Sequence, residues 1–203
     1  MILANFSIET TLWSQGLNMI CGIDEVGRGC FAGPVVAGAV IFPANAKLIE
    51  GIADSKLLKP KTREDLAKRI KDKASAWAVG EISVPDINKF GIGQATQMAF
   101  SKAVANLQKA ADYFLIDAFY VKTLDKLKQK PIPGGDRISA SIAAASIIAK
   151  VYRDELMGKL HIDFPNYGFD KHKGYGTSFH REMIKKFGLS DLHRKSFKLD
   201  KFL

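Results

Sequence analysis

Short apolar runs alternate with amphipathic stretches along most of the chain. Residues 19–24 and 35–42 are apolar and are separated by a glycine-rich turn, which predicts two neighbouring strands. A third strand is predicted over 76–84, and a fourth, buried on both faces, over Tyr113–Asp117. Because helical segments interrupt these strands, the pattern predicts an α/β fold.

Three segments carry the spacing of helices. A helix is predicted over 60–73, because a proline suits its first turn and the apolar residues Leu66 and Ile70 share one face. A longer helix is predicted over 93–110, where small and apolar side chains form a common stripe. The run over 139–160 predicts a further helix, whose alanines and serines allow close packing.

The length of the chain suits one substantial core, since 47% of its 203 residues are hydrophobic. Neither an internal repeat nor a long linker divides it. We therefore expect a single compact unit with a core over 1–160 and a C-terminal part over 161–203. The C-terminal part is more polar and basic, and we expect it to form a small helical appendage.

The charge balance favours an anionic partner. The 30 Lys and Arg residues against 21 Asp and Glu give a formal net charge of +9, which is typical of proteins that bind nucleic acid. General solubility is the alternative explanation of this excess. The charge therefore narrows the class of partner and leaves the activity open.

Cysteine usage and hydropathy exclude several classes of protein. Cys21 and Cys30 form no CxxC pair, so the sequence predicts two reduced packing residues and neither a disulfide framework nor a zinc ribbon. No apolar run has the length of a membrane span, and the N-terminus lacks the basic start of a signal peptide. These features predict a cytoplasmic protein.

Acidic residues follow the ends of two predicted strands. Asp24 and Glu25 are adjacent at the end of the first strand, Asp117 closes the fourth, and Asp136 follows a Gly-Gly turn. Crowded carboxylates repel each other and lose hydration, a penalty that a divalent cation reverses. An oxygen-only set of this kind suits Mg²⁺ or Mn²⁺ better than zinc. For any one of these acids, a capping or salt-bridging role is the alternative.

The adjacency of Asp24 and Glu25 sets a geometric condition. Neighbouring residues of a strand point to opposite faces, so both side chains serve one metal site only if the strand ends or twists there. Gly27 and Gly29 follow at once and favour such an ending. Two metal ions about 3.5–4 Å apart activate water and stabilise the leaving oxygen in phosphodiester hydrolysis, which agrees with the basic charge.

The segment GIDEVGRG at 22–29, continued by GPVVA at 33–37, strongly resembles the opening motif of ribonuclease HII, the type 2 ribonuclease H family. Further blocks similar to the family follow in the same order, and the resemblance covers about residues 18–197. These blocks are DSK at 54–56, LID at 115–117, GD at 135–136, SIAAASIIAKV at 141–151 with RD at 153–154, and HKGYGT at 172–177. The resemblance implies a ribonuclease H-like fold: a mixed five-stranded sheet flanked by helices, with the C-terminal part forming one wall of a substrate groove.

The resemblance also implies an activity. The family hydrolyses the RNA strand of RNA–DNA hybrids and cuts duplex DNA on the 5′ side of a single embedded ribonucleotide, leaving 3′-hydroxyl and 5′-phosphate ends. By resemblance, Asp24, Glu25, Asp117 and Asp136 hold Mg²⁺ or Mn²⁺ and position the ions for attack by water. Asp154 is a rival for the fourth position, but its place late in a helix favours ion pairing.

Substrate contacts are implied as well. By resemblance Gly27, Arg28 and Gly29 contact the ribonucleotide, since glycine admits close approach to the 2′-hydroxyl that distinguishes RNA from DNA. Tyr175 is expected to stack on the next sugar and Lys56 to hold a phosphate. The alternatives are an ordinary turn for the glycines, an ion pair of Arg28 with a neighbouring acid, loop packing for Tyr175 and solvation for Lys56.

The C-terminal part offers two further candidates. Its basic residues form a candidate phosphate-tracking face or, alternatively, a solvated one: His172, Lys173, His180, Arg181, Lys185, Lys186, Arg194 and Lys195. The tail 199–203 loosely resembles tails that dock on a sliding clamp, although the usual glutamine is absent; packing on its own domain is the alternative.

The expected protein is a monomeric enzyme, and it has three rivals. A nucleic-acid-binding module without catalysis is disfavoured because the acidic set is intact. A different nuclease or recombinase of the same fold is disfavoured by the segment 27–29 together with Tyr175, which suits ribose recognition. Ribonuclease HIII carries an added N-terminal domain, whereas fewer than 20 residues precede the first predicted strand.

Overall fold

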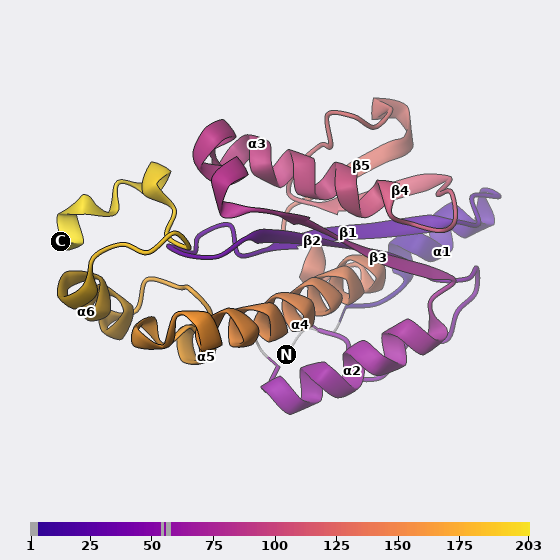
Figure 1. The fold of residues 1–203 in the computed structure, drawn as a ribbon. Helices are drawn as coiled ribbons and strands as arrows, with labels where there is room; N and C mark the ends of the chain where they lie inside the picture. Colours follow the sequence, from indigo (N-terminus) through magenta and orange to yellow (C-terminus); the bar gives the residue numbers. More distant parts are fainter. Residues whose placement is uncertain (1–3, 54, 56–57) are drawn as a thin grey trace.

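The computed structural model describes residues 4–53, 55 and 58–203. A mixed sheet of five strands forms its centre, in the order β3-β2-β1-β4-β5 (Figure 1). Strands β1, β2 and β3 are antiparallel neighbours, whereas β4 and β5 run parallel to β1. The strands are β1 Ile20–Val26, β2 Val35–Ile41, β3 Ala76–Ile82, β4 Tyr113–Asp117 and β5 Gln129–Ile132. The predicted mixed five-stranded sheet flanked by helices is confirmed.

Helices cover both faces of this sheet. Helix α3 (Val84–Ala105) lies on one face, and α4 (Ala140–Asp163) with α2 (Pro60–Lys73) lies on the other (Figure 1). The short helices α5 (Phe169–His172) and α6 (Ser178–Phe187) lie beyond one end of the sheet, past the end of α4. Helix α1 (Ser7–Ser14) precedes β1. None of the helices in the described part of the chain has the length and apolar composition needed to cross a membrane.

Helix α4 lies directly against β1 and β2 because only small groups stand between them. A Cβ atom added to Gly22 would collide with the backbone of Ser141, and one added to Gly38 with the carbonyl of Ala145. The serines and alanines of α4 thus allow the close packing that the sequence predicted. This contact fixes β1 against α4, and therefore fixes the position of the acidic residues at the end of β1.

The largest differences from the sequence predictions are in α3, β5 and α4. The helix expected over 93–110 begins at Val84, after the capping hydroxyl of Ser83, and ends at Ala105. Gly91, with a φ of 78°, interrupts its helical backbone. The apolar stripe changes direction there, so the sequence pattern did not reveal the turns that precede Gly91. Strand β5 was not predicted, because it is an edge strand of polar composition within and just after a lysine-rich stretch. Helix α4 continues past residue 160, to Asp163.

Candidate active site

Three acids lie at the same ends of three parallel strands. The residues before Asp24 and Asp117 are paired in the parallel register of β1 and β4, so these two acids are neighbours across the strands. Asp136 follows β5 in the short turn Gly135–Arg137. The backbone N–H of Gly135 donates to Oδ1 of Asp117 at 2.8 Å, which ties this turn to the end of β4.

Asp24 experiences the charge of all the other predicted metal ligands. Its side chain is 4% exposed, and the pKa of its carboxyl group is raised well above the ordinary value. Burial is the largest cause, and the negative charges of Glu25, Asp117 and Asp136 act in the same direction. A hydrogen bond with Ser146 of α4 acts in the opposite direction. The structure thus brings the four predicted acids into electrostatic contact.

Glu25 is directed to the other face of the sheet from Asp24. Strand β1 continues two residues past the predicted end at Asp24 and stops at Val26, directly before Gly27. Gly22 faces α4, whereas Ile23 packs in the core beneath α3. Alternation along the strand then directs Asp24 toward α4 and Glu25 toward α3. Glu25 is half-buried, and its charge raises the pKa of Asp24 through the strand.

The acids match a divalent cation in the type of their ligand atoms, although their side chains are not close enough together to enclose one. Within residues 4–53, 55 and 58–203, no three Asp, Glu, His or Cys side chains are close enough to enclose an ion. One oxygen of Asp24 accepts the backbone N–H of Glu25 at 2.7 Å, as one oxygen of Asp117 accepts that of Gly135. A buried carboxylate among like charges, with oxygen donors only, suits Mg²⁺ or Mn²⁺.

Two loops beside the acids lie against each other. We call residues 27–34 the ribose loop, after the sugar contact that the resemblance implies, and residues 173–177 the tyrosine loop. The backbone N–H groups of Phe31 and Ala32 both donate to the carbonyl of Gly174, at 2.8 and 3.3 Å. Gly174 has a φ of +85°, and a Cβ atom there would collide with the carbonyl of Ala32. The fold therefore places the loop that begins with the Gly-Arg-Gly segment against the loop that contains Tyr175.

Two fully buried arginines hold these loops in place. Each guanidinium donates to three backbone carbonyls: Arg153 to Pro34, Lys173 and Ala32 at 2.9, 2.8 and 3.1 Å, and Arg194 to Gly33, Arg28 and Pro34 at 2.9, 3.0 and 3.1 Å. Burial lowers the pKa of Arg194 to about 10, which leaves it charged at neutral pH. A Cβ atom on Gly27, where φ is +94°, would collide with Arg153. Composition and periodicity gave no signal for this role.

The groups that the loops present outward are few. Tyr175 is 37% exposed, and the amine of Lys150 lies 5.7 Å from the centre of its ring. Burial and the nearby Cys30 raise the pKa of Tyr175 to about 12, so its hydroxyl stays protonated at neutral pH. The guanidinium of Arg28 lies 4.6 Å from the ring centre of Phe119, just after β4. Gly29 is exposed, and a Cβ atom there would meet nothing within 4 Å.

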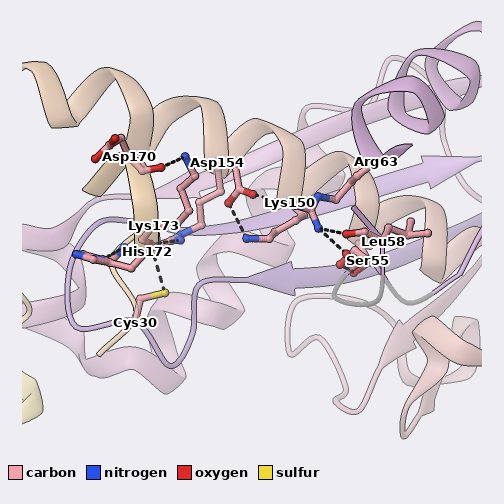
Figure 2. A network of polar contacts seen from close by, with 12 residues as sticks. Cys30, Ser55, Leu58, Arg63, Lys150, Asp154, Asp170, His172 and Lys173 are labelled. Carbon is pink, nitrogen blue, oxygen red and sulfur yellow. Dashed lines mark hydrogen bonds and ion pairs between the residues drawn. The ribbon is translucent and has the colours of Figure 1, made fainter. Parts of the chain in front are cut away.

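A polar network connects α4 to α2 and to the segment before it (Figure 2). Asp154 forms ion pairs with Lys150 at 2.6 Å and with Arg63 at 3.3 Å, which confirms the ion-pairing role that its helical position predicted. Arg63 also donates to the carbonyls of Ser55 and Leu58 at 2.6 and 3.2 Å. The predicted phosphate ligand Lys56 lies outside the described residues.

The predicted phosphate-tracking face is wrong for two of its members. His180 and Arg194 are fully buried, because His180 bonds to the carbonyl of Tyr175 and Arg194 donates to carbonyls of residues 28–34. Four other members of the set are exposed: Arg181, Lys185, Lys186 and Lys195. The sequence pattern could not separate the two groups, since a basic residue that binds buried carbonyls has the same letter as one that binds phosphate.

The fold and the acids define a class of enzyme, the nucleases of the ribonuclease H-like fold. Ribonuclease HII from Archaeoglobus fulgidus, solved in complex with PCNA, superposes with a TM-score of 0.73 and 24% identity over 87% of this chain and 93% of that chain. Bst-RNase HIII, solved in complex with Mn²⁺, superposes with a TM-score of 0.71 and 22% identity over 95% of this chain and 72% of that chain. These two likenesses support the fold.

Relatives found by sequence share more identical residues with this chain than the two solved structures do. The family model for ribonuclease HII matches residues 21–200. Ribonuclease HII of Chlamydia caviae is 48% identical over 198 residues, which cover 97% of this chain and 92% of that relative. The chain belongs to the ribonuclease HII family. It is accordingly a ribonuclease H endoribonuclease, of the family that cleaves the RNA of RNA–DNA hybrids.

Proposed function

We propose that this enzyme also incises duplex DNA on the 5′ side of a single embedded ribonucleotide, leaving 3′-hydroxyl and 5′-phosphate ends. One observation carries the proposal: β1 leads from Asp24 directly into the ribose loop, and the ribose loop is hydrogen-bonded to the tyrosine loop. The segment that we propose for contact with the 2′-hydroxyl begins three residues after Asp24 in the sequence. Recognition of one sugar and cleavage of the adjacent bond thus share one rigid element.

For the metal site we propose Asp24, Glu25, Asp117 and Asp136 as the residues that hold Mg²⁺ or Mn²⁺. The buried Asp24 among like charges supports this assignment, as does the solved Bst-RNase HIII complex with Mn²⁺. When bound, a pair of ions activates the attacking water and stabilises the leaving 3′-oxygen. The chain contributes orientation, because the N–H groups of Glu25 and Gly135 fix one oxygen of Asp24 and of Asp117.

For ribose recognition we propose the segment Gly27-Arg28-Gly29 together with Tyr175. Gly27 has a reason within the protein, since its φ is positive and Arg153 packs against it. Gly29 has no such reason, because a Cβ atom there would meet open space. A substrate that approaches this backbone explains the glycine. Tyr175, half-exposed beside it, offers its ring to the next sugar, and Lys56 remains our candidate for a phosphate contact.

We propose that residues 1–160 form the catalytic core, that 161–203 form one wall of the substrate groove, and that the protein acts as a monomer. The tail packs on its own domain: Leu199 is buried, and the ring of Phe202 stacks on Phe31 at 5.4 Å. The solved A. fulgidus complex with PCNA nevertheless makes residues 199–203 our candidate for a sliding-clamp contact. Clamp binding that is unchanged when these five residues are deleted would discard this candidate.

The incision activity is tested with duplex DNA that carries one ribonucleotide. We expect a nick on its 5′ side with Mg²⁺ or Mn²⁺, none after chelation, and none with Asp24→Asn. An all-DNA duplex of the same sequence is the control for ribose specificity, and an RNA–DNA hybrid is the control for an active preparation. Cleavage of the hybrid without any nick in the single-ribonucleotide duplex would refute the proposal.

A further inference from the structure

Three histidines lie together directly beneath the tyrosine loop. The rings of His172 and His180 stack with their centres 4.3 Å apart, and Nε2 of His180 lies 3.1 Å from Nε2 of His193. His180 and His193 are fully buried. Nδ1 of His180 lies 2.9 Å from the carbonyl oxygen of Tyr175, which joins this cluster to the proposed sugar-binding residue.

The partners of the two buried rings determine which nitrogen carries each proton. Nδ1 of His193 accepts the backbone N–H of Ser190 at 2.9 Å, so its proton is on Nε2. A carbonyl only accepts, so His180 carries its proton on Nδ1 and donates it to Tyr175. Nε2 of His180 is therefore an acceptor, and the Nε2–H of His193 donates to it. Every hydrogen bond in the chain from Ser190 to Tyr175 runs in one direction.

Both rings are neutral at physiological pH. Burial lowers the pKa of His180 and of His193 to about 4, and the neighbouring histidines act in the same direction. A proton added to either accepting nitrogen would place two N–H groups against each other or against a backbone N–H. The order of donors and acceptors therefore holds only in the neutral state.

We propose that His193 and His180 are positioning residues: their directed pair of hydrogen bonds holds the backbone of Tyr175 where its ring meets the sugar at an RNA-to-DNA junction. This inference rests on the sugar-binding role proposed above for Tyr175. The carbonyl of Tyr175 also accepts the N–H of Thr177 at 2.8 Å, and its N–H donates to the carbonyl of His172 at 3.0 Å. With His180, these bonds fix the peptide groups on both sides of Tyr175.

Matched substitutions at His193 separate positioning from packing. His193→Gln keeps a donor near the Nε2 position and removes the acceptor for Ser190, whereas His193→Asn keeps that acceptor and removes the donor to His180. Both variants lose volume. His193→Gln also loses the contacts of Nδ1 with the backbone N–H and the hydroxyl of Ser190, and His193→Asn loses the hydrogen bond to His180. We expect His193→Asn to lower kcat/KM on the single-ribonucleotide duplex about tenfold, and His193→Gln to stay within about threefold of wild type. Equal losses in the two variants would overturn the proposal.

Ring ¹⁵N chemical shifts give a readout that is independent of catalysis. We expect His180 as the Nδ1–H tautomer and His193 as the Nε2–H tautomer in the wild-type protein at pH 7. His180 with its proton on Nε2 would overturn the relay whatever the activities are. Tyr175→Ala tests the underlying function separately: unchanged incision in that variant, with the expected tautomers intact, refutes the role of Tyr175 and leaves the hydrogen-bond order standing.

Discussion

The carboxylate edge and the pair of loops beside it achieve their order in opposite ways. At the edge, Asp24 is buried among like charges, and its pKa is raised. In the loops, Arg153 and Arg194 are buried against carbonyls, and neutral histidines complete the network. Burial and like charges therefore oppose the ionised form of Asp24, whereas the buried arginines of the second region bind backbone carbonyls of the chain. The proposed catalytic and recognition roles are divided along the same line.

The largest expected effect follows from neutralising the edge. Asp24→Asn keeps the acceptor for the N–H of Glu25 and removes the charge that a cation would bind. We expect cleavage of an RNA–DNA hybrid to fall about a thousandfold, since metal-assisted stabilisation of the attacking and leaving oxygens is lost. Without metal, the free energy of unfolding should rise by about 1 kcal/mol, because repulsion is relieved. Initial cleavage rates and urea unfolding in chelator measure the two effects.

The matched control is Asp154→Asn, a carboxylate that already has Lys150 and Arg63 as partners. Cleavage should stay within about fivefold of wild type, and stability should fall rather than rise. If Asp154→Asn abolished cleavage as Asp24→Asn does, the division between a metal-binding edge and an internally satisfied region would be misplaced.

Removing a charge from the support of the loops should lower the free energy of unfolding, whereas Asp24→Asn should raise it. Arg194→Met keeps much of the apolar stem but removes the charged donor of the Gly33 and Arg28 carbonyls. The carbonyl of Pro34 loses one of two donors and keeps Arg153. We expect the free energy of unfolding to fall by roughly 3 kcal/mol, measured by urea unfolding. Arg181→Met, on the exposed surface, is the control and should change stability by less than about 0.5 kcal/mol. If Arg194→Met were as stable as wild type, Arg194 would not be needed to hold residues 27–34 in place.

The free energy of unfolding should also change at low pH. His180 and His193 have pKa values of about 4 in the folded protein and 6.5 ordinarily, so the unfolded chain binds more protons between these values. Their contribution to stability is complete above pH 6.5 and is lost as pH falls toward 4. From pH 7 to pH 5 we expect the free energy of unfolding to fall by on the order of 3 kcal/mol. Urea unfolding at each pH measures this change. His180→Phe should show a flatter pH dependence over this window, and an unchanged slope would count against the assignment.

The sequence predicted the edge better than the loops. Apolar runs predicted β1, β2 and β4, and Pro60 predicted the start of α2. Asp24 lies near the end of β1, and Asp117 ends β4. These are local signals, which a single sequence displays. Asp136 was a candidate because it follows a Gly-Gly turn, and the resemblance strengthened that assignment, since β5, the strand before it, is polar and was not predicted.

The support of the loops depends on contacts between distant segments. His180 lies 13 residues from His193 in the sequence, and Arg194 lies 166 from Arg28, so no local pattern shows that they meet. Their burial is also contrary to their composition, because charged and polar letters predict a surface. A basic stretch was therefore interpreted as a phosphate-tracking face, and the structure places part of it in the interior.

The smallest expected effect tests the part of the loops that faces outward. Gly29→Ala adds one methyl group where nothing in the protein lies within 4 Å, so urea unfolding should remain within about 0.5 kcal/mol of wild type. If a substrate backbone approaches this position, incision beside a single ribonucleotide should fall about tenfold.

Gly27→Ala is the counterpart inside the network, because its φ is +94° and Arg153 fills the space that the methyl group needs. This variant should lose stability as well as incision. Incision that is unaffected in Gly29→Ala would mean that the ribose loop serves the protein's interior alone. In that case the two regions would differ in charge and in support, but recognition of the sugar would have to come from Tyr175.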